Sequence, residues 1–172
     1  MIYLDNAATT LYKPRAVEQA VRRAMYGAAG YARGSYAAAG RAGELVYACR
    51  EQAAALFGVG EPERVIFTLN ATHALNIAIN ALVKPDSRVI VSGYEHNAVM
   101  RPLTARNIEP TVLDTPLWDG AAMVSALKQA LEHGADLMIL SHVSNVFGSI
   151  APLDEIAELL TAAGVPLILD AS

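Results

Sequence analysis

Short apolar runs alternate with amphipathic stretches from Arg64 to the end of the chain. Runs rich in Val, Ile and Leu predict strands, and apolar residues that recur every three to four positions between them predict helices. Strands separated by helices are typical of parallel βαβ units. We therefore expect an α/β fold, with an open, mostly parallel sheet and helices on both faces. The strands are expected near residues 64–68, 88–92, 110–113, 136–141 and 165–169, and the helices near residues 71–83, 97–106, 120–133 and 153–163.

The first part of the chain has a different, helical pattern. Pro14 is suited to open a helix, and after a glycine-rich loop a second helix is expected to end at Gly58. We therefore expect an N-terminal helical segment over residues 1–60 and an α/β domain over residues 61–172.

The single cysteine, Cys49, falls within the second of these helices. It shares a three-to-four-residue spacing with an apolar stripe, which predicts a buried, structural thiol. One cysteine allows neither a disulfide framework nor a cysteine-based metal site. The stripe comprises Leu45, Val46, Ala53, Leu56 and Phe57.

Composition and charge narrow the class of protein. The chain has 172 residues, of which 53% are hydrophobic, enough for one ordinary domain with a continuous core. Its net charge of −4, without any run of Lys or Arg, gives no footprint for a nucleic acid or an anionic membrane. No apolar run reaches the roughly 18 residues that span a bilayer, and the start lacks the pattern of a signal peptide. We therefore expect a cytoplasmic protein.

Polar residues follow four of the five predicted strands. They occupy residues 70–73, 93–97, 142–145 and 170–172. Ligands of an open α/β sheet bind beyond the carboxyl ends of its strands. We therefore expect these four clusters to share one edge of the sheet.

Each cluster also has a simple structural interpretation. Asn70 and Thr72 are residue types that cap helices. His96 fits a solvated loop, and Asn145 tolerates a turn conformation. Asp170 is harder to explain in this way, because a carboxylate at the end of an inner strand needs a partner or a ligand.

The segment from Val65 to Asn76 runs from an apolar strand through a small polar turn into an amphipathic helix. This arrangement places the free N–H groups of a helix start before a bound anion. Apolar residues at Leu75, Ile79 and Leu82 suit one helix face for packing on the sheet. We therefore expect a phosphate group at Ala71, Thr72 and His73.

Pyridoxal 5'-phosphate, with its phosphate, flat ring and cationic ring nitrogen, accounts for all four clusters. Thr72 would bind the phosphate, His96 would stack on the ring, and Asn145 would donate to the phenolic oxygen. Asp170 would keep the pyridine nitrogen protonated, which strengthens the cofactor as an electron sink. The predicted cofactor site comprises Ala71, Thr72, His73, His96, Asn145 and Asp170, with His96 and Asp170 as its catalytic members.

Five ordered motifs resemble the class V aminotransferases, closest to the cysteine desulfurase and selenocysteine lyase branch. They are YLDNAATT at 3–10, FTLNATHALN at 67–76, EHNAV at 95–99, SHVSNVFG at 141–148 and ILDAS at 168–172. The resemblance covers essentially the whole chain. It implies a fold of the aspartate aminotransferase type, of which this chain would supply part of the large, cofactor-binding domain.

The resemblance also implies a function. Such enzymes bind pyridoxal phosphate, usually as homodimers, and take sulfur from cysteine as an enzyme-bound persulfide, leaving alanine; selenocysteine is the corresponding substrate of the lyases. By matching position, Asn6 and Ala7 would lie near the substrate. The family often has Glu at the position of His73 and His at that of Tyr36, so this chain departs from the pattern at two places.

Family members continue past the position of Asp170 with a Gln, the Schiff-base lysine, and a small domain that carries the persulfide cysteine and a carboxylate-binding arginine. Lys13, Lys84 and Lys128 do not follow strands at the ligand edge and are not assigned as the Schiff-base residue. We therefore expect the N-terminal part of a longer enzyme, inactive by itself, with an unpaired sheet edge that favours association.

Other functions stay open. A transaminase or another β-lyase of the same family would use the same cofactor site. A non-covalent phosphate- or nucleotide-binding module would use the same helix start, although neither G-x-G-x-x-G after the first strand nor a P-loop occurs. A metal hydrolase is the third alternative, with His73, His96, His142 and Asp170 as ligands, but no pair of them has a recognised helical ligand spacing.

Overall fold

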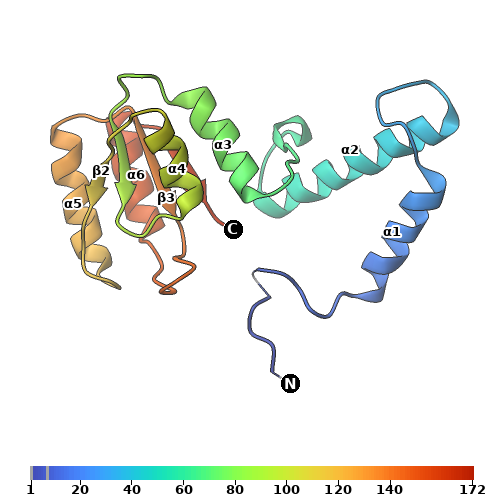
Figure 1. The fold of residues 1–172 in the computed structure, drawn as a ribbon, viewed down its shortest axis with the longest axis horizontal. Coiled ribbons are helices and arrows are strands. Elements are labelled where there is room, and N and C mark those ends of the chain that lie inside the picture. The colour runs from blue at the N-terminus through green and yellow to red at the C-terminus, as the bar shows by residue number, and fades with distance from the viewer. Residues whose placement is uncertain (1, 7) are drawn as a thin grey trace. The chain divides into compact units, whose positions relative to one another are not determined.

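The computed structural model describes residues 2–6 and 8–172. The chain divides into two compact units, one within residues 1–67 and one over residues 68–172. We call them the helical unit and the sheet unit, and each is described by itself (Figure 1).

In its described residues, the helical unit contains two helices and one short 3-10 turn. Helix α1 spans Arg15–Gly27 and follows Pro14, and helix α2 spans Ala37–Phe57. The left-handed residue Gly58, with φ of 66°, ends α2 because a residue without Cβ adopts this conformation without strain. The 3-10 turn η1 spans Pro62–Arg64. The helix starting after Pro14 and the one ending at Gly58 are thus confirmed.

The prediction that Cys49 is buried is wrong, because its thiol is exposed. The stripe around it is also open, with Leu56 and Phe57 exposed to 78% and 76%. Helix α2 buries only two small side chains, those of Ala39 and Ala54. Helical periodicity shows which face is apolar, but burial requires a packing partner, and within the helical unit Leu56 and Phe57 stay exposed.

The sheet unit contains a four-stranded parallel sheet in the order β2-β1-β3-β4. The strands are β1 (Val89–Ser92), β2 (Thr111–Leu113), β3 (Leu137–Ser141) and β4 (Leu167–Asp170). The helices that connect or precede them are α3 (Ala71–Leu82), α4 (Asn97–Ala105), α5 (Gly120–Glu132) and α6 (Leu153–Ala163). These four strands and four helices match the predicted ones within two residues at each end.

The strand predicted near residues 64–68 is wrong. Its first residue, Arg64, ends η1, and residues 65–68 form no ladder with the described strands. Ile66 and Phe67 are 67% and 49% exposed. An apolar run becomes a strand only where a neighbour takes its backbone hydrogen bonds, and this segment has no such neighbour in the described chain.

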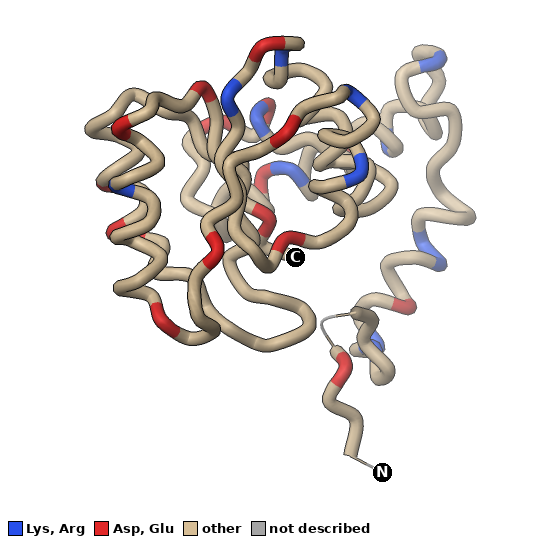
Figure 2. The backbone as a smooth tube through the Cα atoms, turned by 60° about the vertical axis from the view of Figure 1, so that its left-hand side comes forward, with Lys and Arg blue, Asp and Glu red and all other residues tan. Residues whose placement is uncertain are grey.

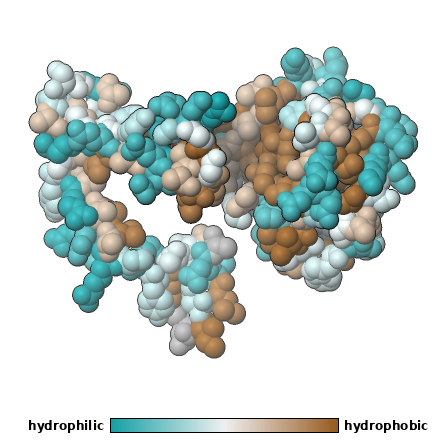
Figure 3. Space-filling view, turned by 180° about the vertical axis from the view of Figure 1, so that it is seen from behind, coloured by the Kyte–Doolittle hydropathy of each residue, from teal (hydrophilic) through white to brown (hydrophobic). Residues whose placement is uncertain are grey.

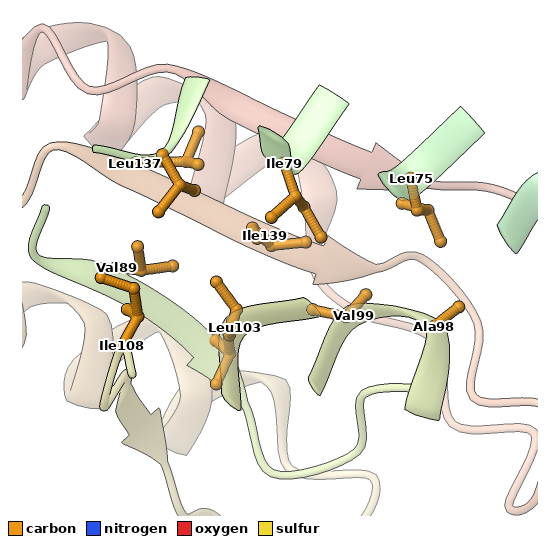
Figure 4. Close-up of a cluster of buried hydrophobic side chains, with 11 residues drawn as sticks. Leu75, Ile79, Val89, Ala98, Val99, Leu103, Ile108, Leu137 and Ile139 are labelled. Carbon is orange, nitrogen blue, oxygen red and sulfur yellow. The ribbon is translucent and has the colours of Figure 1, made fainter. Parts of the chain in front are cut away.

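Two apolar cores lie on opposite faces of the sheet. Helices α3 and α4 cover one face over Val89, Val91, Leu137 and Ile139 (Figure 4). Helices α5 and α6 cover the other face, which Ile90, Met138 and Leu140 line. Alternate residues of each central strand therefore point to alternate cores, as a strand buried on both sides requires. The predicted fold class, a mostly parallel α/β sheet with helices on both faces, is confirmed.

Arg88 and Asp136 clamp β1 to β3 at the start of both strands. Asp136 Oδ2 accepts a hydrogen bond of 2.8 Å from Arg88 N, and the guanidinium Nη2 lies 3.4 Å from Asp136 Oδ1. Arg88 Nη1 also donates to the carbonyl of His133 at 2.9 Å. The hydrogen bonds from Arg88 hold the pKa of Asp136 below its ordinary value of 3.8.

The clamp makes the stability of the sheet unit depend on pH. A carboxyl whose pKa is lower in the folded state stabilises the fold above its ordinary pKa, and this contribution disappears as the pH falls through the lowered value. We expect Asp136→Asn to lower the free energy of unfolding near neutral pH and to have no effect in strong acid, measured by urea unfolding at both. Asp114→Asn, at an exposed carboxyl, is the control. An equal loss for Asp136→Asn at both pH values would contradict the clamp.

The surface of the sheet unit is mixed in character. Apolar side chains show as brown areas in Figure 3, and the exposed ones of this unit include Val146, Phe147 and Ile150. Charges of both signs are spread along the tube in Figure 2. Over the residues that the structure describes, no helix has both the length and the apolar character needed to cross a membrane.

Candidate functional site

The carboxyl ends of β1, β3 and β4 lie at one edge of the sheet, because the three strands are parallel neighbours. Ser141 at the end of β3 is in register with Asp170 at the end of β4. The pairing continues one residue further, where His142 N donates to the carbonyl of Asp170 at 2.9 Å. The polar residues that follow β3 and β4 are therefore adjacent.

Glu95 joins the ends of β1 and β3. Its Oε1 accepts hydrogen bonds from Ser92 Oγ at 2.6 Å and from Ser141 N at 3.0 Å, and its Oε2 accepts one from Ser141 Oγ at 2.8 Å. Ser92 is buried and the carboxylate itself is half-buried. Glu95 is not among the predicted site residues, although it stands in the polar segment 93–97 that follows β1.

Helix α3 begins with a side-chain cap and two free amides. Asn70 Oδ1 accepts a hydrogen bond of 2.8 Å from His73 N, so Asn70 caps the helix. The His73 ring accepts from Leu69 N at 3.4 Å. No described residue accepts a hydrogen bond from the amides of Ala71 or Thr72. The anion-binding capacity of this helix start therefore lies at Ala71 and Thr72, because the cap already uses the His73 amide.

His96 caps helix α4 with its ring. Its Nδ1 accepts a hydrogen bond of 3.0 Å from Ala98 N, so the neutral ring carries its proton on Nε2. The side chain is exposed, and therefore the ring faces and Nε2 are open to a ligand. The cap fixes one nitrogen of the ring in place, so the ring has a defined orientation.

A groove of about 390 Å³ brings Thr72 and His96 together between α3 and α4. Its volume lies within the range of roughly 300–1,000 Å³ typical of small-molecule sites. Figure 4 shows Leu75, one turn into α3, and Ala98, in the first turn of α4, near the arrowheads of β4 and β3, so both helices begin toward the edge where these strands end. The groove is lined by Thr72, Asn76, His96, Asn97, Ala98, Arg101, Pro102 and Ala105.

Two polar groove residues, Asn76 and Arg101, were missed by the sequence analysis. Both follow from helical spacing, since Asn76 lies four positions after Thr72 and Arg101 four after Asn97, and residues four apart share a helix face. Arg101 adds a positive charge to the lining of the groove, which makes the groove more favourable for an anion.

The remaining predicted residues lie elsewhere. Asp170 is half-buried, and its Oδ1 accepts from the Ser172 amide at 3.2 Å and from the Ser172 hydroxyl. Asn145 is exposed in the loop between β3 and α6, and neither residue lines the groove. Asn6 belongs to the helical unit, where its Nδ2 donates to the carbonyl of Tyr3 at 3.4 Å, and Ala7 lies outside the described residues.

The described part of the chain offers no cluster of side chains that could bind a metal ion. Residues 2–6 and 8–172 contain no group of three or more His, Cys, Asp or Glu side chains placed to hold a metal ion. The metal-hydrolase alternative therefore lacks a ligand cluster there.

Comparisons with known proteins agree with this architecture. The family model described as "Aminotransferase class-V" matches residues 2–172. A cysteine desulfurase IscS of Shewanella loihica is 34% identical over 180 residues, which cover 99% of this chain and 44% of that protein. The chain thus spans less than half the length of this curated relative.

Two solved structures are similar as well. DndA from Streptomyces lividans aligns with a TM-score of 0.74 at 34% identity, covering 99% of this chain and 49% of its own. The apo cysteine desulfurase from Thermococcus onnurineus NA1 aligns with a TM-score of 0.86 at 24% identity, covering 99% of this chain and 44% of its own. The second likeness concerns the fold alone.

Proposed function

Because the chain belongs to the class V aminotransferase family, we propose that its sheet unit binds pyridoxal 5'-phosphate at the carboxyl edge of the sheet. The observation that carries this proposal is the groove in which Thr72 and His96 meet beside the free amides of α3. A phosphate and an aromatic ring on one ligand need these two kinds of contact within a few ångströms of each other.

The residues present fit the cofactor. The amides of Ala71 and Thr72 and the Thr72 hydroxyl would hold the phosphate, and Arg101 would add a neighbouring positive charge. The His96 ring, oriented by its bond from Ala98 N, would stack on the pyridine ring. His73 would contribute less than expected, because its amide is bonded to Asn70.

Two further residues are proposed on the ring edge. Asp170, at the end of β4, would accept a hydrogen bond from the protonated pyridine nitrogen, and Asn145 would donate to the phenolic oxygen. When bound, the cofactor supplies an electron sink for the carbanion that forms when a bond to the substrate α-carbon breaks. Asp170 would maintain that capacity by keeping the nitrogen charged.

We propose that the longer protein containing this sequence acts as a cysteine desulfurase, which releases alanine and passes the sulfur on as a persulfide. This follows from the names of the relatives, and a transaminase or another β-lyase is the alternative within the family. Under this proposal, residues 61–172 are part of a cofactor-binding domain, Asn6 and Ala7 lie near cysteine or selenocysteine, and the complete enzyme is a cytoplasmic homodimer. The chain by itself would not convert cysteine to alanine, because it would lack a Schiff-base lysine. Its lysines, Lys13, Lys84 and Lys128, do not follow strands at the ligand edge.

A titration of the purified chain with pyridoxal phosphate, followed by absorbance and fluorescence, tests the cofactor site. We expect saturable binding that inorganic phosphate weakens by competition, together with no alanine or sulfide when cysteine is added. Binding of ATP without binding of pyridoxal phosphate would favour a nucleotide-binding module instead. Robust production of alanine and sulfide would contradict the expected inactivity.

A further inference from the structure

We infer that Glu95 is a positioning residue, which holds the His96 loop against the end of β3 and so sets the place of the His96 ring in the groove. The inference rests on the proposed function, in which His96 contacts the cofactor ring. It concerns a residue that contacts no ligand itself.

The carboxylate of Glu95 accepts hydrogen bonds from two neighbouring strands of the sheet. Ser92 lies at the end of β1, and Ser141, 46 positions after Glu95, lies at the end of the neighbouring strand β3. All three partners donate, and an ionised carboxylate can only accept, so the donor and acceptor roles match completely. Hydrogen bonds to a charged acceptor are stronger than neutral ones, which favours a fixed geometry.

The loop that contains Glu95 is fixed at its other residues too. Gly93 N donates to the carbonyl of Leu113 on β2 at 3.1 Å, and the Tyr94 hydroxyl donates to the carbonyl of Thr115. The Tyr94 ring meets the Phe147 ring edge-on, with centroids 5.9 Å apart. Glu95 supplies the polar bond to β3 immediately before His96, and therefore it is the last anchor before the ring that enters the groove.

The His96 ring depends on this anchor because the ring itself makes a single hydrogen bond within the described part of the chain. Its Nδ1 accepts the cap bond from Ala98 N, which holds the ring at the start of α4. The hydrogen bond that Glu95 accepts from Ser141 N ties the residue before His96 to β3, whose Ser141 is in register with Asp170. Glu95 thereby fixes the distance between the His96 ring and Asp170, the proposed partner of the pyridine nitrogen of the cofactor.

Variants of Glu95 separate this role from general stabilisation. Glu95→Ala removes the anchor, whereas Glu95→Gln keeps it, since the amide oxygen accepts from Ser92 and Ser141 N and the amide nitrogen donates to Ser141 Oγ. Asp136→Ala is the matched control, because it breaks the clamp between the same two strands at their opposite ends. Ser141→Ala, which removes only one of the three donors, is a milder variant in case Glu95→Ala does not fold.

Two measurements on the 172-residue chain are needed, the affinity for pyridoxal phosphate and the hydrogen exchange rate of the Ala98 amide, which reports the His96 cap. We expect Glu95→Ala to weaken pyridoxal phosphate binding and to speed Ala98 exchange, each on the order of tenfold, and Ser141→Ala to do so by about threefold. Glu95→Gln and Asp136→Ala should stay within about twofold of the wild type in both measurements.

The outcomes distinguish the inference from the function on which it rests. If the wild type binds pyridoxal phosphate and Glu95→Ala binds it equally well, the positioning role is wrong and the proposed function stands. If Asp136→Ala has the same effect as Glu95→Ala, the effect is a general loss of stability and the inference is overturned. If the wild type does not bind pyridoxal phosphate, the proposed function fails, and unchanged Ala98 exchange in Glu95→Ala would then overturn the anchor as well.

Discussion

Ile139→Ala is expected to lower the free energy of unfolding of the chain by about 2–5 kcal/mol. Ile139 is fully buried on β3, with Val91 of β1 and Ile168 of β4 as its register partners on either side. It packs in the same core as Ile79 of α3 (Figure 4). Truncation to Ala would leave a cavity in this core, because the close-packed side chains around it have little freedom to move into the space.

Equilibrium unfolding in urea measures this loss directly. The control is Ile150→Ala, which makes the same chemical change at a side chain that is 67% exposed, and which should change the free energy of unfolding by no more than about 0.5 kcal/mol. Similar losses for both variants would contradict the burial of Ile139 in the core that it shares with Ile79.

Asp170→Asn is expected to weaken binding of pyridoxal phosphate by roughly 10- to 100-fold, which corresponds to the loss of a hydrogen bond between two charged groups. The substitution keeps the shape of the side chain and removes its charge. An uncharged amide oxygen no longer stabilises a protonated ring nitrogen, so the cofactor loses this contact while the phosphate site stays intact.

The affinity of the variant for pyridoxal phosphate, determined by fluorescence titration, tests this expectation. Asp154→Asn, which removes one exposed carboxylate from the start of α6, controls for the change in net charge and should leave the affinity within about twofold. Equal affinities of Asp170→Asn and the wild type would exclude Asp170 from the cofactor site.

Most of the sheet unit could be predicted from local pattern. Strands such as Leu137–Ser141 are short runs buried on both faces, and helices such as Leu153–Ala163 repeat apolar residues at helical spacing. The two wrong predictions, a strand at residues 64–68 and a buried Cys49, share one cause. Both segments are apolar and correctly patterned, but burial and strand pairing depend on a second element that the local pattern does not specify.

The location of the candidate site could be predicted from the sequence, but the contacts between its side chains could not. The polar residues after each strand could be found because parallel strands end at one edge, and the groove does bring Thr72 and His96 together. The contacts of Glu95 could not be found, because they depend on the register between β1 and β3 and join residues 46 positions apart. Arg101, in contrast, could have been predicted from the sequence, because it lies four positions after Asn97 and so shares a helix face with it.

The most direct test of the central claim is an amide chemical-shift map of the nitrogen-15-labelled chain as pyridoxal phosphate is added. If the separate loops meet around one ligand, the largest shifts will occur together at Thr72, His96 and Asp170, and the amides of Arg88 and Asp136 at the opposite end of the sheet will not move. Shifts at Thr72 without any at His96 and Asp170 would show that only a phosphate is recognised, and would contradict the proposed cofactor site.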